Sequence, residues 1–327
     1  MNTTKGFRHF GMLMMILSLI SISGLAQKKT GQPGARAVLW EPVNGERDLL
    51  LGPGGAEMKP DLRKVTFVKE HTNGHNKKYE IKDASGRTWI AKLGTEAQPE
   101  TSAVRILYGL GYKTEINYLV PHLTIPGIGR FENVRLEARP KDVKRLDEWK
   151  WRDNPFIGSN ELQGLKIMMV FFTNYDLLDL QNKVIEVHNN GTVEDQYIIS
   201  DLGATFGKLG NNNLPVLFRL GRKSNDPATW NEAGFISKVK RNGYIDFDFK
   251  GKSRDLMNDI TVEQGRWLAD RLMQLTDRQI TDAFRAANYE PDWVEIMKIG
   301  FKGRVKELDE ATRMTRVSVA GLTKPTG

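Results

Sequence analysis

The chain has 327 residues, of which 39% are hydrophobic, so it can bury a substantial core as one two-lobed domain or as two small domains. It contains no cysteine, and we therefore expect neither a fold that rests on disulfides nor a lipoprotein anchor. The formal net charge of +8 favours anionic partners such as nucleotides, but the basic residues are interspersed with acids, so we expect no nucleic-acid partner.

The N-terminus has the pattern of a targeting segment. Lys5 and Arg8 precede an apolar run over residues 12–22, and small residues follow up to Ala26. The run is short for a membrane span and no stop-transfer sequence follows it, so we predict a cleavable signal peptide over residues 1–26. The alternative is an uncleaved N-terminal anchor. The signal predicts a periplasmic or secreted protein with no stable membrane span after cleavage.

Residues 27–60 are predicted to be a flexible tether that then wraps onto the domain. Alternating apolar and polar residues follow over 64–70, 78–83 and 87–93. Polar turns separate these three stretches, and the first turn is centred on Gly74. This pattern predicts a small antiparallel sheet.

A helix is predicted next, from Pro99 to about Leu110, because a proline suits its first position and Gly109 and Gly111 stop it. Residues 116–127 and 131–140 predict two further strands. Lys92 ends the strand before the helix, where a lysine either extends along the surface or points at an anion. Glu100 lies in the first helical turn, where it favours the helix dipole and is also placed to meet Lys92.

The second half of the chain is predicted to be mainly helical. Residues 141–159 are charged and aromatic and predict a short helix with a loop, whereas 160–172 are apolar enough for a core helix. An Asn-Asn-Gly turn within residues 184–200 predicts a hairpin whose second strand delivers Asp201.

Two capping boxes further along the chain predict helix starts. They pair Thr261 with Gln264 and Thr276 with Gln279, and apolar residues follow each at helical spacing. From about Thr312 the sequence is polar, and we expect a frayed end.

Six polar side chains occur in an order that matches the needs of phosphoryl transfer: Lys92, Glu100, Asp176, Asp179, Asn182 and Asp201. Transfer from ATP uses a lysine on the phosphates, an acid that orients it, a carboxylate that positions the acceptor hydroxyl, and an amide and a carboxylate that hold Mg²⁺. Asp201 carries the most weight, because an acid that leaves an apolar strand is costly to desolvate unless something pairs with it.

With these residues the chain resembles the protein-kinase-like superfamily over about Lys64 to Tyr289. "WIAKL" resembles the kinase strand that ends in its lysine, and "ISDLG" resembles the kinase Asp-Phe-Gly motif. The loop "TNYDLLDLQN" is closer to the atypical branch, which includes HipA-like, phosphoinositide and CotH kinases, and the chain also looks like a group of exported bacterial proteins. The resemblance implies an α+β fold with a β-rich N-lobe over 61–139, a mostly helical C-lobe over 140–311 and a polar tail over 312–327.

The resemblance also implies roles for the residues of the N-lobe. Lys92 would contact the phosphates of ATP, and Glu100 would pair with Lys92. The turn at Gly74 would replace the glycine-rich loop, with Asn76 or Lys77 near the phosphates. This loop departs from the family pattern because it holds a single glycine.

In the C-lobe the resemblance implies that Asp176 is the catalytic aspartate, Asn182 a metal ligand and Asp201 the principal ligand of Mg²⁺ or Mn²⁺. The kinase pattern places its metal-binding Asn five residues after the catalytic Asp. Here Asn182 is six residues after Asp176 and three after Asp179, so either aspartate could be catalytic. Leu177 occupies a position that is often basic in the atypical branch.

We therefore expect an exported Mg-ATP-dependent transferase that passes phosphate, or a nucleotidyl group, to a hydroxyl of an unknown protein or small molecule. A catalytically degenerate kinase fold that serves as a binding or scaffold module of the cell envelope is the alternative. A third possibility, binding of cell-wall polysaccharide, rests on Trp149 and Trp151 as exposed aromatics. The sequence has no His-Glu-x-x-His and no Gly-x-Ser-x-Gly motif, which argues against zinc and hydrolase sites.

Overall fold

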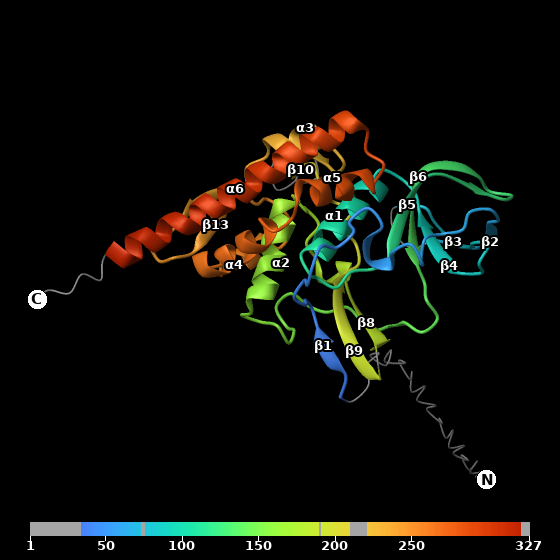
Figure 1. Cartoon of the computed structure of the whole chain (residues 1–327), viewed down its shortest axis with the longest axis horizontal. Helices are drawn as coiled ribbons and strands as arrows, with labels where there is room; N and C mark the ends of the chain where they lie inside the picture. The colour runs from blue at the N-terminus through green and yellow to red at the C-terminus, as the bar shows by residue number, and fades with distance from the viewer. Residues whose placement is uncertain (1–33, 73–75, 190, 210–220, 322–327) are drawn as a thin grey trace, which may run out of the picture.

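The computed structural model describes residues 34–72, 76–189, 191–209 and 221–321 (Figure 1). Over these ranges the chain forms a sheet-based N-lobe and a mostly helical C-lobe. The predicted signal peptide and Gly74 lie outside the described residues. Within the described ranges, no helix combines the length and apolar character that a membrane span requires.

The N-lobe contains a five-stranded antiparallel sheet in the order β2-β3-β4-β6-β5. Helix α1 (Ala97–Gly109) connects β4 to β5, as the sequence predicts. The strands are β2 (Thr66–His71), β3 (Lys78–Lys82), β4 (Thr88–Lys92), β5 (Asn117–Ile125) and β6 (Gly129–Ala138).

The two faces of this sheet differ because side chains alternate along each strand. Ile81, Trp89 and Leu136 point to one face, where they form an apolar core that Met58 and Leu62 cover from the preceding segment. The opposite face carries polar and charged residues and is turned toward the C-lobe. This arrangement leaves the polar face of the sheet available to form one wall of a cleft.

The segment before the sheet is ordered from residue 34 onward, where we had expected part of a flexible tether. It forms β1 (Arg36–Val38) and the 3-10 turn η1 (Gly52–Gly54). The segment passes so close to Gly111, whose φ is +101°, that a Cβ there would lie 2.3 Å from the Glu41 carbonyl oxygen. Glu41 N–H also donates to the Gly111 carbonyl at 3.0 Å, which fixes the segment against the end of α1.

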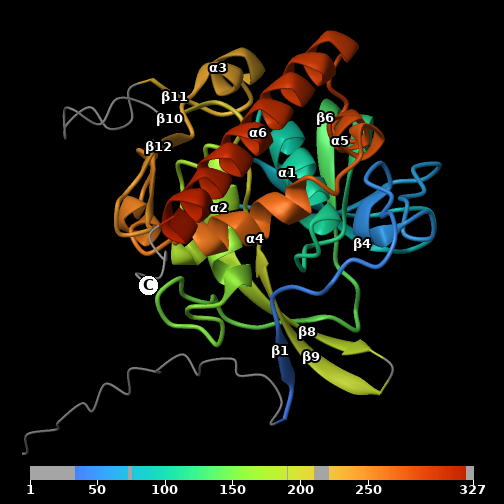
Figure 2. The ribbon, with the colours of Figure 1, turned by 60° about the vertical axis from the view of Figure 1, so that its left-hand side comes forward.

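The helices of the C-lobe are α2 (Asn160–Phe171), α3 (Pro227–Glu232), α4 (Val262–Leu272), α5 (Asp277–Arg285) and α6 (Pro291–Gly321). Figures 1 and 2 show the long α6 crossing this lobe, and it packs against α3, α4 and α5. Both predicted capping boxes are present at the starts of α4 and α5. The predicted core helix is α2, which is buried from Leu162 to its end.

A second sheet has the order β1-β9-β8-β7 and contains the predicted hairpin. The hairpin consists of β8 (Asn182–Asn189) and β9 (Thr192–Ile199), and β7 (Lys144–Arg145) pairs with β8. Figure 1 shows the hairpin extending from the body of the C-lobe with β1 beside it. The short ladders β10 (Lys208–Leu209) with β11 (Arg222–Lys223) and β12 (Ile236–Val239) with β13 (Ile245–Phe247) complete the lobe.

Three predictions about the C-lobe were wrong. Residues 141–159 form β7 and turns instead of a short helix. Trp149 and Trp151 are buried, with their ring centroids 4.8 Å apart, so they offer no exposed platform for a polysaccharide. Helix α6 continues through Gly321, past the point where we expected fraying. The overall arrangement is nevertheless the two-lobed α+β fold that the sequence predicts, with an antiparallel, β-rich N-lobe and a mostly helical C-lobe.

Candidate functional site

A cavity of about 600 Å³ lies between the lobes, and we call it the cleft. Strands β3, β4 and β6 and helix α1 provide its N-lobe wall. The loop after α2, the end of β9 and the segment after β13 provide its C-lobe wall. The cleft is lined by Asn76, Lys78, Ile90, Lys92, Glu96, Glu100, Arg135, Glu137, Arg139, Arg145, Asp176, Leu178, Leu180, Gln181, Ser200, Asp201, Ala204 and Lys252.

Lys92 joins the two lobes at one end of the cleft. Its Nζ lies 2.8 Å from Glu100 Oε2, 3.1 Å from Asp201 Oδ1 and 3.5 Å from Glu96 Oε2. The expected meeting of Lys92 with Glu100 is therefore present, and Asp201 joins it from the C-lobe. Lys92 is only 4% exposed, so this contact is shielded from solvent.

The electrostatics of this contact favour a charged lysine. Burial alone would lower the pKa of Lys92, but the carboxylates of Glu100 and Asp201 outweigh burial and raise it above its ordinary value. Burial would raise the pKa of Asp201, but Lys92 and the Gly203 N–H together hold it below its ordinary value. Burial raises the pKa of Glu100, although Arg135 and Lys92 oppose this. Asp201 is thus the group most firmly held as an anion.

The turn after Asp201 approaches α1 closely. A Cβ on Gly203 would lie 2.6 Å from the Glu96 Cβ, so a larger residue would push the turn away from the helix. Gly203 N–H donates to Asp201 Oδ1 at 3.1 Å, which orients the carboxylate. Glu96 also accepts a hydrogen bond from Asn76 of the N-lobe. The glycine of the "ISDLG" motif therefore serves the docking of Asp201 against the N-lobe.

Asp176 faces the same cleft from the loop after α2. Its backbone N–H donates to Asn174 Oδ1 at 3.0 Å, which fixes the turn. Gln181 Nε2 donates to Asp176 Oδ2 at 2.6 Å. Lys252 forms an ion pair with Asp176 Oδ1, and its backbone N–H donates to the Tyr175 carbonyl at 3.0 Å. Each carboxylate oxygen of Asp176 therefore has a partner from within the cleft.

Two of the predicted C-lobe residues lie elsewhere. Asn182 is fully buried, and its amide donates to the Trp149 carbonyl at 3.0 Å. Asp179 Oδ1 accepts from the Trp151 N–H at 3.0 Å, so it stabilises a turn. Neither side chain lines the cleft. We therefore correct the assignment of Asn182 as a metal ligand, because its side chain points into the core.

Sequence reasoning missed Gln181 and Lys252. Gln181 is five residues after Asp176, which is the spacing of the kinase metal-binding Asn, and that spacing could have identified it. Lys252 comes from the segment between β13 and the 3-10 turn η4 (Arg254–Met257), and no local motif marks it. Leu177 occupies the position that is often basic in the atypical branch. Lys252 instead places a cation beside Asp176 from a distant part of the chain.

The proposed phosphate loop is only partly described. Gly74 lies outside the described residues, whereas Asn76 lines the cleft. Lys77 is exposed and is not among the lining residues, and its carbonyl accepts from the Leu93 N–H at 3.1 Å. The adjacent Lys78 lines the cleft instead.

The residues present fit a Mg²⁺ ion that is held by few protein ligands. Asp201 offers a carboxylate and Gln181 an amide oxygen, which are hard donors. Among the described residues, no three His, Cys, Asp or Glu side chains are grouped as a metal cluster. Mg²⁺ commonly keeps several waters and binds substrate phosphates besides one or two carboxylates, so the two donors are sufficient.

Glu96, Glu100, Asp176 and Asp201, together with Lys92 and Lys252, form what we call the carboxylate end of the cleft. The opposite end, which we call the arginine end, consists of Arg135, Arg139 and Arg145 with Glu115 and Glu137. Arg145 Nη2 donates to Ser200 Oγ at 3.0 Å, one residue before Asp201. Arg135 links the two ends, because its Nη2 lies 3.3 Å from Glu100 Oε1.

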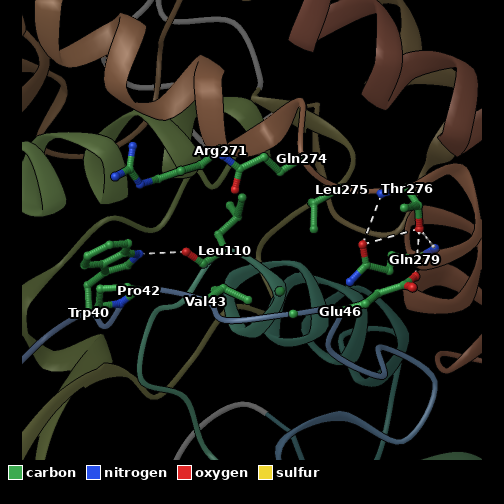
Figure 3. Close-up of a pocket in the computed structure, with 12 residues that line it drawn as sticks. Trp40, Pro42, Val43, Glu46, Leu110, Arg271, Gln274, Leu275, Thr276 and Gln279 are labelled. Carbon is green, nitrogen blue, oxygen red and sulfur yellow. Dashed lines mark hydrogen bonds between the residues drawn. The ribbon is translucent and has the colours of Figure 1, made fainter.

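Another cavity, of about 350 Å³, lies between the N-terminal segment, the end of α1 and the start of α5 (Figure 3). Several of its polar groups have protein partners: Trp40 Nε1 donates to the Leu110 carbonyl at 2.7 Å, and Thr276 and Gln279 belong to the capping box of α5. Arg271 lies over the Trp267 ring at 3.8 Å. This cavity is a seam between packed elements, without the converging charges of the cleft.

No family model matches the chain, and no curated protein matches it. Among solved structures, the chain is similar to the proinflammatory kinase CtkA of Helicobacter pylori, with a TM-score of 0.47 and 10% sequence identity. The similarity covers 79% of this chain and 98% of that chain. A likeness this distant carries no argument about activity, which has to come from the cleft itself.

Proposed function

We propose that the chain is an exported, atypical-kinase-like protein that binds Mg-ATP, or its Mn²⁺ equivalent, in the cleft and transfers phosphate to a hydroxyl group. The observation that carries this proposal is the contact of Lys92 with both Glu100 and Asp201. It brings a buried cation and an ionised carboxylate from opposite lobes to one point, in a cleft that Asp176 also faces. Nucleotidyl transfer to the same acceptor is the variant reaction, and the acceptor is a protein or a small molecule.

The residues of the cleft divide the work of phosphoryl transfer among them. Lys92 would neutralise the phosphates nearest the N-lobe, and Glu100 would hold Lys92 in place. Asp201 and Gln181 would hold the metal ion, which supplies neutralisation of the phosphate charge. Asp176 would orient the acceptor hydroxyl and accept its proton.

Lys252 would complete this site from outside the predicted motifs. Its ammonium group pairs with Asp176. The lysine is 41% exposed at its side chain, so it can turn toward a phosphate at little cost in desolvation. Release of this pair would free Oδ1 of Asp176 for the acceptor hydroxyl.

Thermal unfolding with and without Mg-ATP tests the proposal, because a ligand that binds only the native state raises the melting temperature. We expect a rise for the wild type and a much smaller rise for Asp201→Asn. Glu310→Gln is the matched control, since Glu310 belongs to an exposed ion pair on α6 and does not line the cleft. No rise for the wild type, or an equal rise for Asp201→Asn, would refute nucleotide binding in this cleft.

The degenerate, scaffold-type kinase fold is the second candidate. It is favoured by the pairing of both Asp176 oxygens, with Gln181 and with Lys252. This candidate predicts binding of Mg-ATP without turnover, even when acceptor proteins from the envelope are supplied. Measured phosphate transfer that is lost in Asp176→Asn would exclude it.

A further inference from the structure

The cleft is unusually polar for a site that would enclose a purine base. Eleven of its eighteen lining residues are charged, and only Ile90, Leu178, Leu180 and Ala204 are apolar. The strand register explains this composition. Lys78 lies opposite Lys92, Lys92 opposite Arg135, and Ile90 opposite Glu137. These side chains share one face of the sheet, so the roof of the cleft is a row of charges interrupted by one apolar residue.

The arginine end carries an excess of positive charge. Glu137 is surrounded by three guanidinium groups, with Arg135 Nη1 at 2.9 Å, Arg145 Nη1 at 3.5 Å and Arg139 in close contact. Glu115 lies 2.7 Å from Arg145 Nη1 and 3.3 Å from Arg135 Nη2. Within this end three cations share Glu115 and Glu137, which leaves 3 − 2 = +1, and Arg135 also reaches Glu100 of the carboxylate end.

Arg139 is the member of this cluster whose charge is least compensated. Burial, together with the neighbouring Arg145 and Arg135, lowers the pKa of its guanidinium to about 10, although Glu115 opposes this. Its side chain is 28% exposed, so a ligand can reach it. An anion placed here would relieve the repulsion among the three arginines.

The backbone at the arginine end offers little to the edge of a base. The Ala138 N–H donates to the Ile116 carbonyl and the Arg139 N–H to the Thr88 carbonyl, each at 2.9 Å. Pro140 follows and has no N–H. A purine in this position would meet charged side chains on its apolar faces and occupied donors along its edge. Both features disfavour its burial.

We propose that the cleft accepts an inorganic polyphosphate chain as phosphoryl donor and binds Mg-tripolyphosphate at least as tightly as Mg-ATP. The inference rests on the proposed function and specifies its donor. The terminal phosphate would lie at the carboxylate end, beside Lys92, Lys252 and the metal ion. The rest of the chain would extend toward Arg139 and Arg145, whose guanidinium groups suit bidentate phosphate binding.

The reaction balances without a nucleoside. The oxygen of the acceptor hydroxyl attacks the terminal phosphorus and forms a new O–P bond. The bond from that phosphorus to the bridging oxygen breaks, and the shortened polyphosphate leaves with the electron pair. The hydroxyl proton passes to the Asp176 carboxylate and from there to solvent. The products are a phosphorylated acceptor and a chain that is shorter by one phosphate.

Calorimetric titration of the full chain in the presence of Mg²⁺ tests the donor, with tripolyphosphate, a longer polyphosphate, ATP and adenosine as the probes. We expect tripolyphosphate to bind at least as tightly as ATP, the longer chain to bind more tightly still, and adenosine not to compete. Arg139→Gln should weaken the longer chain about tenfold, which is the worth of one charge-assisted phosphate contact, and by more than it weakens ATP. The affinity of Arg139→Lys for the longer chain should lie between those of the wild type and Arg139→Gln, because lysine keeps the charge and loses the bidentate geometry.

Arg313→Gln, at an exposed position on α6, is the matched control and should change none of these affinities. Binding of ATP tenfold tighter than tripolyphosphate, with competition by adenosine, would overturn the inference while the proposed function stands. Equal losses for ATP and the longer chain in Arg139→Gln would also overturn it. Failure of the proposed function looks different, because then none of the phosphate ligands binds and Asp201→Asn changes nothing.

Discussion

The two ends of the cleft carry opposite excesses of charge. At the carboxylate end, Lys92, Lys252 and the adjacent Lys78 face four carboxylates, which leaves 3 − 4 = −1. At the arginine end, three arginines face two carboxylates, which leaves 3 − 2 = +1. A negative excess favours binding of a metal cation, and a positive excess favours binding of an anion. The cleft can therefore bind both the metal ion and the phosphates of a metal–phosphate ligand. Substitutions at the two ends should therefore differ in their effects on catalysis and on stability.

The largest effect should follow from removal of the Asp176 carboxylate, which would orient the acceptor hydroxyl. Asp176→Asn keeps the shape of the side chain and the hydrogen bond with Gln181. It cannot take up the proton of the acceptor hydroxyl. Loss of a general base commonly costs about 10²- to 10⁴-fold, and we expect a loss of that order in kcat with little change in donor affinity. Steady-state kinetics with a hydroxyl acceptor measure it. A variant that keeps wild-type kcat would remove Asp176 from the reaction.

Next in size should be the loss of stability when the lobe-joining lysine is removed. Lys92→Met leaves Glu100, which is 1% exposed, without its nearest cation. Breaking a buried ion pair at one partner commonly costs about 3–5 kcal/mol in the free energy of unfolding. Denaturant unfolding measures it, and Lys92→Met combined with Glu100→Leu should recover part of the loss. Recovery in the double variant would show that the cause is the buried Glu100 carboxylate, which is left with Arg135 as a cation partner.

The pH dependence of stability should separate two carboxyls that both touch Lys92. The pKa of Asp201 is lowered in the folded state, so its contribution is present above the unfolded value of about 3.9 and is lost as pH falls through the lower folded value. The pKa of Glu100 is raised, so its contribution is present below about 4.3 and is lost as pH rises through the higher folded value.

Denaturant unfolding over about pH 3 to 7, a range that spans the unfolded-state pKa values of both carboxyls, compares the variants. In Asp201→Asn, the free energy of unfolding should fall less steeply as the pH is lowered. In Glu100→Gln, it should fall less steeply as the pH is raised. If both variants retained the wild-type profile, neither carboxyl would have a shifted pKa in the folded state.

The smallest effect should come from the hydrogen bond that ties the arginine end to Asp201. Ser200 Oγ accepts from Arg145 and donates to Glu115 Oε1 at 3.0 Å. Ser200→Ala should cost about 1 kcal/mol in the free energy of unfolding, as for a typical hydrogen bond. Ser200→Thr keeps the hydroxyl and should cost less. A larger loss for Ser200→Thr than for Ser200→Ala would indicate that steric clashes of the added methyl group outweigh the hydrogen bond.

Much of the fold was predictable because local signals and tertiary packing agree. The capping boxes of Thr261 and Thr276, the apolar run of α2 and the Asn-Asn-Gly hairpin each act over a few residues. Residues 141–159 offered no periodic pattern, and their structure depends on distant partners. Trp149, for example, donates its Nε1–H to the Ile198 carbonyl at 2.9 Å, which places the ring in the core.

The site was predictable only in part, for a geometric reason. Gln181 ends a 3-10 turn (Asp179–Gln181) and Asn182 begins β8, so these two adjacent side chains point in different directions. An error of one residue therefore exchanges a cleft-facing amide for a buried one, which is the difference between Gln181 and Asn182. Lys252 reaches Asp176 across 76 residues of sequence, and no local pattern could reveal it.

The strand β1 has a consequence for the order in which the protein assembles. It pairs in parallel with β9, and Arg36 meets Glu194 across a sequence separation of 158 residues. During synthesis β1 leaves the ribosome well before β9 (Thr192–Ile199) exists, so it has no strand partner while the N-lobe and the first part of the C-lobe are made. Contacts this distant along the chain close late and slow the search for the native state. The strand beside the Asp201 hairpin is thus among the first elements to be synthesised, but it can pair only after the whole N-lobe and β9 have followed it.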